Sequence, residues 1–220
     1  MRRDFVFDDG GMNLLSSQAL RMLRSAVAES HAATQQPSNP VTLFVFRSGR
    51  PNIFAAGADM AEMQKFGAFE AEEFARLGQE LFEEIERLPC ITVALIDGDC
   101  FGGALDLVLS FDLRLATPRS RFAHPGARLG IVTGFGGTSR WRKVISRKAA
   151  NQLFLANRVL SVEEALSLDL VDRVAVSHED ELTRLEGLDA GMVKELARHA
   201  DRLSRTELLL LATRLGVRRP

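Results

Sequence analysis

Residues 94–107 read ALIDGDCFGGALDL, and this stretch carries the clearest information on fold in the chain. An apolar segment, predicted to be a strand over residues 91–96, enters a turn that contains Gly102 and Gly103. A second apolar segment, with the carboxylate of Asp106 on its first turn, leaves it. Glycines let a backbone turn sharply and let a ligand approach its N–H groups. A helix that begins there directs unpaired donors at the ligand, as in an oxyanion hole, although many such turns only reverse the chain.

A second segment of this kind lies earlier in the chain, where residues 54–60 read FAAGADM after the strand-like run VTLFVF at 41–46. Further ordered motifs are FAHP at 122–125, LGIVTGFGGTSR at 129–140, LSVEEA at 160–165 and LDLVD at 168–172. In these motifs and in their order the chain resembles the enoyl-CoA hydratase/isomerase (crotonase) superfamily. The resemblance covers roughly residues 5 to 175.

The resemblance implies an α/β fold, the ββα spiral of the ClpP/crotonase type, in which roughly perpendicular sheets are wrapped by helices. It implies a single domain with its core at residues 1–175 and a C-terminal helical extension at 176–220, shorter than usual in the family. In the family this segment closes the pocket and packs the subunits. A homotrimer or homohexamer is therefore expected, with the leucine run at 208–211 buried against a neighbouring subunit.

Periodicity predicts the longer elements independently of the resemblance. Apolar residues at helical spacing predict helices at 16–31 and 70–88, and shorter ones at 147–156 and 161–168. Ser161 and Glu164 form the pattern of a capping box at the start of the last of these. Strands are predicted at residues 5–7, 41–46, 91–96 and 113–116. Strands that alternate with helices indicate parallel βαβ units.

Composition narrows the class of protein. The chain has 220 residues, enough for one α/β domain, and a formal net charge of −1, so neither nucleic acid nor a membrane is expected as a partner. Cys90 and Cys100 fit no metal-ligand spacing, and no metal is expected. They are interpreted as buried thiols of a reducing compartment, with a reactive Cys100 as the alternative. With no long apolar run or signal peptide, a soluble cytoplasmic protein is predicted.

The resemblance also implies a site. In the family, two backbone N–H groups hold the acyl-CoA thioester carbonyl while it develops enolate character. The motif match places these donors at Ala58 and Gly103. Ala56, Ala58 and Asp59 would line the channel that holds the adenine end of CoA. No separate cofactor is expected, because CoA enters as the thioester of the substrate.

The acid–base groups depart from the family pattern. Hydratases of the family use two glutamates, and the matching positions here are Asp106 and Gly126. Gly126 cannot transfer a proton, so this pair of positions indicates that the protein does not catalyse ordinary hydration. His124 is the candidate that would replace the missing acid, since imidazole titrates near neutral pH. The alternative is that His124 only packs beside Pro125, and Asp106 is either a lone base or a structural group.

The prediction is therefore a crotonase-like acyl-CoA enzyme of fatty acid metabolism that catalyses a lyase, decarboxylase or isomerase reaction. Its catalytic residues would be Ala58, Gly103, Asp106 and His124. The alternative is a catalytically silent acyl-CoA-binding homologue or a subunit of a larger complex. Three weaker candidates for the pocket, each more typical of plain surface or of a structural role, are Glu62, Glu80 and Arg128.

Overall fold

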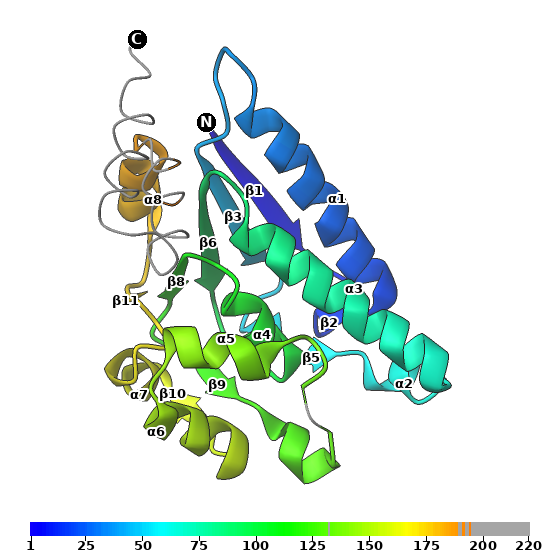
Figure 1. Cartoon of the computed structure of the whole chain (residues 1–220). Coiled ribbons are helices and arrows are strands. Elements are labelled where there is room, and N and C mark those ends of the chain that lie inside the picture. Colours follow the sequence, from blue (N-terminus) through cyan, green and yellow to red (C-terminus); the bar gives the residue numbers. More distant parts are fainter. Residues whose placement is uncertain (132, 189–190, 192–193, 195–220) are drawn as a thin grey trace, which may run out of the picture.

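The structure is a computed structural model that describes residues 1–131, 133–188, 191 and 194 (Figure 1). Its largest sheet is five-stranded and parallel, with the strand order β1-β3-β6-β8-β11. A four-stranded sheet has the order β10-β9-β7-β4, and a small sheet pairs β2 with β5. The strands are β1 (Arg2–Phe7), β2 (Leu14–Leu15), β3 (Leu43–Ser48), β4 (Ile53–Ala55), β5 (Gly57–Ala58), β6 (Ile91–Ile96), β7 (Asp99–Phe101), β8 (Leu113–Ala116), β9 (Arg121–Ala123), β10 (Leu160–Ser161) and β11 (Arg173–Val174).

Helices of very different length connect and cover these strands. They are α1 (Ser17–Thr34), α2 (Met60–Met63), α3 (Ala68–Glu86), α4 (Gly103–Val108), α5 (Gly137–Val144), α6 (Arg147–Ala150), α7 (Val162–Ser167) and α8 (Glu179–Glu186). A 3-10 turn, η1, covers Pro125–Leu129, and a π-helical turn, η2, covers Asn151–Leu155. Figure 1 shows α1 and α3 side by side along one flank of the large sheet, with α8 on the opposite flank.

Strand pairs repeat along the chain. In β3–β4, β6–β7 and β8–β9 the first strand joins the five-stranded sheet and the second joins the four-stranded sheet. Helix α3 follows the first pair, by way of β5 and α2, and α4 directly follows the second. The connection inside each pair therefore links the two sheets, and the turns after the first two pairs lead toward helices. This repeat confirms the predicted α/β ββα architecture.

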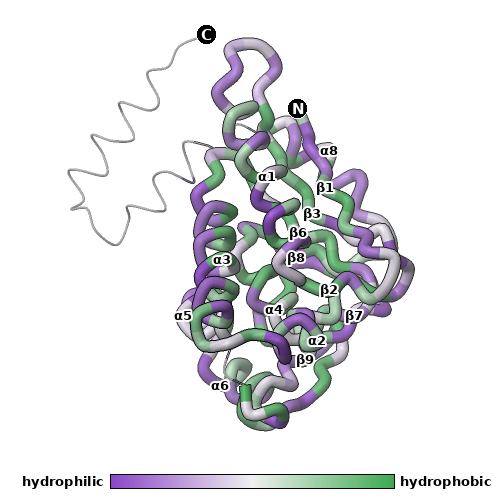
Figure 2. Tube along the Cα trace, turned by 90° about the vertical axis from the view of Figure 1, so that its right-hand side faces the viewer, coloured by the Kyte–Doolittle hydropathy of each residue, from purple (hydrophilic) through white to green (hydrophobic). Residues whose placement is uncertain are grey.

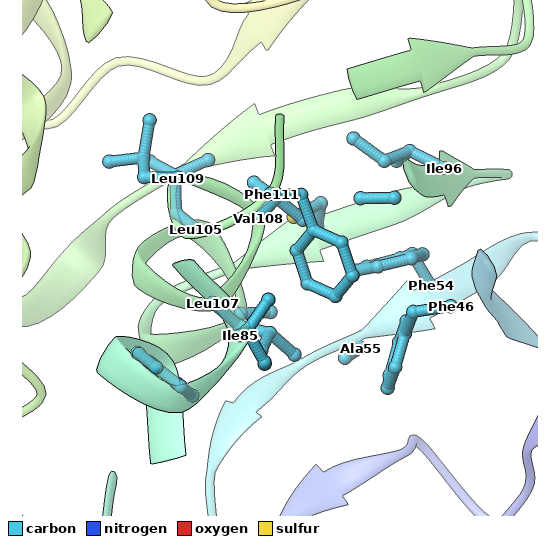
Figure 3. Close-up of a cluster of buried hydrophobic side chains, with 14 of the residues drawn as sticks. Phe46, Phe54, Ala55, Ile85, Ile96, Leu105, Leu107, Val108, Leu109 and Phe111 are labelled. Atoms are coloured by element: carbon cyan, nitrogen blue, oxygen red, sulfur yellow. The ribbon is translucent and has the colours of Figure 1, made fainter. Parts of the chain in front are cut away.

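The central strands of the large sheet, β3 and β6, are buried on both faces because they are largely apolar, whereas the edge strands β1 and β11 carry charged residues and are only partly buried. Successive side chains of a strand point to opposite faces, so neighbouring residues of β3 enter different clusters. Phe46 belongs to the main core with residues of α1, α3 and α4, part of which Figure 3 shows. Val45 belongs to a smaller cluster with Leu182 and Leu185 of α8. Figure 2 shows the same pattern as green segments along the inner strands and purple ones along the outer helices.

Most of the predicted elements agree with the structure. The strands at 91–96 and 113–116 are confirmed, and the helix predicted at 70–88 is α3, Ala68–Glu86. Ser161 and Glu164 form the predicted capping box of α7. The single helix predicted at 147–156 is wrong in form, because α6 ends at Ala150 and the chain continues as a π-helical turn.

The predicted C-terminal segment, 176–220, starts after the end of β11 and contains α8. The leucine run at 208–211 lies outside the described residues, so its predicted burial stays a prediction. In the part of the chain that is described, no helix combines the length and the apolar character needed to cross a membrane.

Candidate active site

A cavity of about 250 Å³ opens beside the turns that follow β4 and β7. Five predicted site residues line it, and they come from separate segments of the sequence. These residues are Ala56, Ala58, Gly103, Asp106 and His124. The rest of the wall is mainly apolar and comes from α2, α3 and residues 125–135. The repeated ββα arrangement thus brings the predicted segments together.

Two glycine turns meet at the bottom of this cavity. Gly57 and Gly102 both adopt positive φ, +102° and +56°, which side chains disfavour. A Cβ atom on Gly57 would lie 2.8 Å from the carbonyl oxygen of Phe101 and 3.1 Å from the amide nitrogen of Gly103. One on Gly103 would lie 3.4 Å from the amide nitrogen of Ala58. The bare backbones therefore approach closely enough to place the Ala58 and Gly103 amides side by side.

The Gly103 amide is also available to a ligand because of its place in a helix. Gly103 is the first residue of α4, and N–H groups in the first turn of a helix have no acceptor within the helix. The aligned peptide dipoles add partial positive charge at this end. Together with the neighbouring Ala58 amide, the turn has the donor arrangement of an oxyanion hole.

Asp106 lies one turn further along α4, with 1 % of its surface exposed. Its Oδ2 accepts a hydrogen bond from the Thr133 hydroxyl and lies 3.7 Å from Nε2 of His124. Its Oδ1 has no hydrogen-bond partner among the described residues. Asp106 and His124 therefore form a buried pair of ionisable side chains at the cavity wall.

The His124 ring occupies the space beside Gly126. A Cβ atom on Gly126 would lie 3.1 Å from Cε1 and 3.2 Å from Nδ1 of this ring, and 2.8 Å from the carbonyl oxygen of Ile131. A glutamate at position 126 would thus require the imidazole to move. The ring also packs against Phe154, with 4.6 Å between the ring centroids. His124 therefore packs in the wall and also lines the cavity, and its predicted acid–base role stays a prediction.

Comparison with known proteins identifies the family of the chain. A family model described as "Enoyl-CoA hydratase/isomerase" matches residues 15–205. The chain belongs to this family. It is 34% identical over 194 residues to a crotonyl-CoA hydratase of Syntrophomonas wolfei. The aligned region covers 88% of this chain and 72% of the relative. The chain is 33% identical over 170 residues to a mitochondrial methylglutaconyl-CoA hydratase of Mus musculus, covering 77% and 52% of the two chains.

Some of these family relatives are much longer than the present chain, which spans between about half and three quarters of the first curated relatives. Solved structures show the same fold. An enoyl-CoA hydratase of Bacillus anthracis superposes with a TM-score of 0.84 at 22% identity, covering 97% of this chain and 84% of that one. DspI of Pseudomonas aeruginosa superposes with a TM-score of 0.85 at 23% identity, covering 98% and 90%. The crotonase fold is therefore confirmed.

Asp59, the remaining residue predicted from the family pattern, does not line the cavity. It is the N-cap of α2, and its carboxylate accepts hydrogen bonds from the amides of Ala61 and Glu62. Asp59 therefore shapes the loop that carries Ala58. Its predicted contact with the adenine end of CoA stays a prediction.

The weaker candidates have structural contacts elsewhere. Glu62 Oε2 accepts a hydrogen bond from the amide of Ser17 at 2.8 Å, at the start of α1. Glu80 pairs with Arg24 at 3.2 Å and with Arg76 at 2.8 Å on the outside of α1 and α3. Arg128 is exposed and is not part of the cavity wall. None of the three is placed to move a proton in this cavity.

Sequence reasoning missed Thr133 and Phe135, both in the glycine-rich stretch before α5. The Thr133 hydroxyl holds Asp106, and the Phe135 ring forms part of the cavity wall. The sequence shows this stretch only as one of the family motifs, and no local pattern indicates which distant residue its side chains contact. A hydroxyl and a large ring between glycines were the only available signals.

The alternative of a reactive Cys100 can be tested by alkylation. Burial raises the pKa of the Cys100 thiol well above its ordinary value and that of Cys90 from 9.0 to about 11. Iodoacetamide at pH 8 is expected to modify neither thiol in the native protein and both in urea, as counted by intact mass. Folding raises the pKa values of both thiols, so ionisation of either thiol favours the unfolded chain. The free energy of unfolding should therefore be unaffected by the thiols below pH 9 and should decrease as the pH rises above 9. Rapid native labelling of Cys100 would contradict the assignment.

Proposed function

We propose that the chain acts on an acyl-CoA thioester and stabilises its enolate with the backbone amides of Ala58 and Gly103. The observation that carries this proposal is that both amides border the same cavity as the buried pair of Asp106 and His124. A thioester oxygen between the two N–H groups would gain hydrogen bonds as its negative charge develops. Each such donor contributes on the order of 3–4 kcal/mol to a transition state.

The cavity wall favours an apolar acyl group. Asp106 and His124 are the ionisable side chains of the described wall, and no lysine or arginine is among its residues. The remaining side chains are largely hydrocarbon or aromatic, including Met63, Phe74 and Phe135. A carboxylate bound here would lose its hydration, and the one cation among the described wall residues, a protonated His124, would already be paired with Asp106, so the energy of the carboxylate would rise.

This environment favours decarboxylation as the reaction. In a 2-carboxyacyl-CoA the bond from Cα to the carboxylate breaks, CO2 leaves, and the electron pair remains on the enolate held by Ala58 and Gly103. His124 then donates a proton to Cα and recovers one from solvent. Asp106 lies beside Nε2 and would stabilise the protonated ring between turnovers. One proton-transfer unit suffices for this sequence, and also for a double-bond isomerisation.

Hydration is the second candidate, because the relatives named above are hydratases. It requires Asp106 and His124 to hold one water between them and to move two protons, as paired carboxylates do elsewhere. A protein that binds acyl-CoA without turning it over is the remaining alternative.

Mass spectrometry of a substrate panel distinguishes these functions. The purified chain is incubated separately with crotonyl-CoA, 3-hydroxybutyryl-CoA, malonyl-CoA and methylmalonyl-CoA. Loss of CO2 from the last two, with crotonyl-CoA unchanged, is the expected result. Gain of water by crotonyl-CoA would favour hydration instead, and binding without any product would favour the silent homologue.

Phe135 sets the depth of the acyl pocket in this proposal. Its ring packs so closely on α3 that a Cβ atom on Gly78 would lie 2.6 Å from its Cε1 atom. The measured quantity is the kcat/KM for a substrate with a decanoyl chain divided by the kcat/KM for one with a butyryl chain. Phe135→Ala is expected to raise this ratio about tenfold, because the enlarged pocket buries more methylene groups of the longer chain. Gly78→Ala, which pushes the ring toward the cavity, is expected to shift the ratio the other way. An unchanged chain-length order in both variants would contradict this role.

A further inference from the structure

Two buried polar atoms behind the cavity lack partners among the described residues. One is Oδ1 of Asp106, which can only accept a hydrogen bond while the carboxylate is ionised. The other is Nε1 of Trp141, on α5, which can only donate one. Leaving either group without a hydrogen bond in the protein interior costs free energy. An unpaired acceptor and an unpaired donor near each other therefore indicate that the two groups pair.

Both atoms lie close to Gly137. Gly137, at the start of α5, has no side chain, and a Cβ atom there would lie 2.5 Å from Cγ of Asp106 and 2.9 Å from Nε1 of Trp141. Oδ1 of Asp106 lies even closer to that point than Cγ does. Both atoms therefore lie close to one point, and we expect a small rotation of the Asp106 carboxylate to bring Oδ1 within hydrogen-bond distance of the indole N–H.

The indole ring is fixed by stacking. Trp141 stacks on Phe154 with ring planes 6° apart, and Phe154 also contacts the ring of His124. Phe154 belongs to the π-helical turn η2, a local distortion that often occurs at functional sites. Trp141 itself is not part of the cavity wall. One aromatic stack thus supports both members of the acid–base pair from behind.

We propose that Trp141 is a positioning residue whose indole N–H donates to Oδ1 of Asp106, while the Thr133 hydroxyl holds Oδ2. This inference rests on the proposed function for the importance of Asp106 in turnover, but the contact itself does not. With both oxygens held, the carboxylate keeps one orientation toward His124. Gly137 is required because any side chain there would occupy the meeting point.

The contact can be observed without any substrate. Trp141 is the only tryptophan of the chain, so one indole N–H signal appears in a proton–nitrogen NMR spectrum. The signal is expected to lie downfield, to exchange slowly with solvent and to move strongly in Asp106→Asn. The matched control Asp180→Asn, an exposed aspartate on α8, should leave it in place. An indole signal that is identical in wild type and Asp106→Asn would overturn the inference.

Turnover supplies the second readout. Trp141→Phe keeps a ring to stack on Phe154 and removes the N–H, so kcat is expected to fall about tenfold with KM unchanged. In the Asp106→Asn background the same change should have no further effect, which a merely structural role would not produce. A full additional loss in that background would overturn the inference. If the wild type turns over no acyl-CoA while the indole signal responds to Asp106, the proposed function fails and the contact stands.

Discussion

Gly103→Pro is expected to lower turnover of the acyl-CoA substrate by about 10²–10³-fold. Proline has no backbone N–H, so the substitution removes one of the two donors that we propose for the thioester oxygen. Gly103 is the first residue of α4, where proline is well tolerated because that N–H bonds nothing in the helix. The loss should therefore appear in kcat rather than in the folded fraction, as measured by steady-state kinetics alongside circular dichroism.

Gly103→Ala is the matched control for this substitution. Alanine adds a Cβ atom 3.0 Å from the Phe135 ring, as proline does, but it retains the N–H group. Its turnover should stay well above that of Gly103→Pro. Equal activity of the alanine and proline variants would show that steric crowding, and not the lost donor, explains the effect.

Asp106→Asn is expected to reduce kcat by about 10²–10⁴-fold. The amide has the shape of the carboxylate but cannot stabilise a protonated His124, whose Nε2 lies 3.7 Å from Oδ2 in the native protein. The free energy of unfolding in urea should change little, since removing a charge that is 1 % exposed offsets the weaker hydrogen bonds that the amide accepts. A variant that keeps full turnover would exclude Asp106 from the reaction.

His124→Gln and the double variant complete this experiment. If Asp106 and His124 work as one unit, the double variant should be no slower than the slower single variant, because either change alone disables the pair. Losses that add in free energy would assign the two residues independent roles.

Elements with a clear period, an apolar run or a capping signal could be predicted from the sequence, and elements without such a signal could not. The amphipathic spacing over α3 and the apolar run of β6 contain enough residues for a period to show. β5 has only Gly57 and Ala58, so its pairing with β2 depends on the packing of the surrounding chain. The π-helical turn η2 likewise has no sequence pattern that separates it from a continuing α-helix.

The site divides in the same way. That Ala58 and Gly103 border one cavity was predictable from the family motifs, because a close approach of backbone groups requires small residues and so leaves a pattern in the sequence. The contact of Thr133 with Asp106 was not, because it depends on how the segment before α5 packs on α4. Trp141 was missed for the same reason. Its spacing on α5 looks like ordinary core, and the group it faces lies on another helix.

Decarboxylation of methylmalonyl-CoA in deuterium oxide, followed by mass spectrometry, tests enolate stabilisation at this site most directly. The wild-type chain should release CO2 and yield propionyl-CoA with one deuterium at Cα, the position where the enolate is quenched. Gly103→Pro should form this product at least a hundredfold more slowly. Hydration of crotonyl-CoA by the wild type with methylmalonyl-CoA left intact, or equal rates for wild type and Gly103→Pro, would contradict the proposed function.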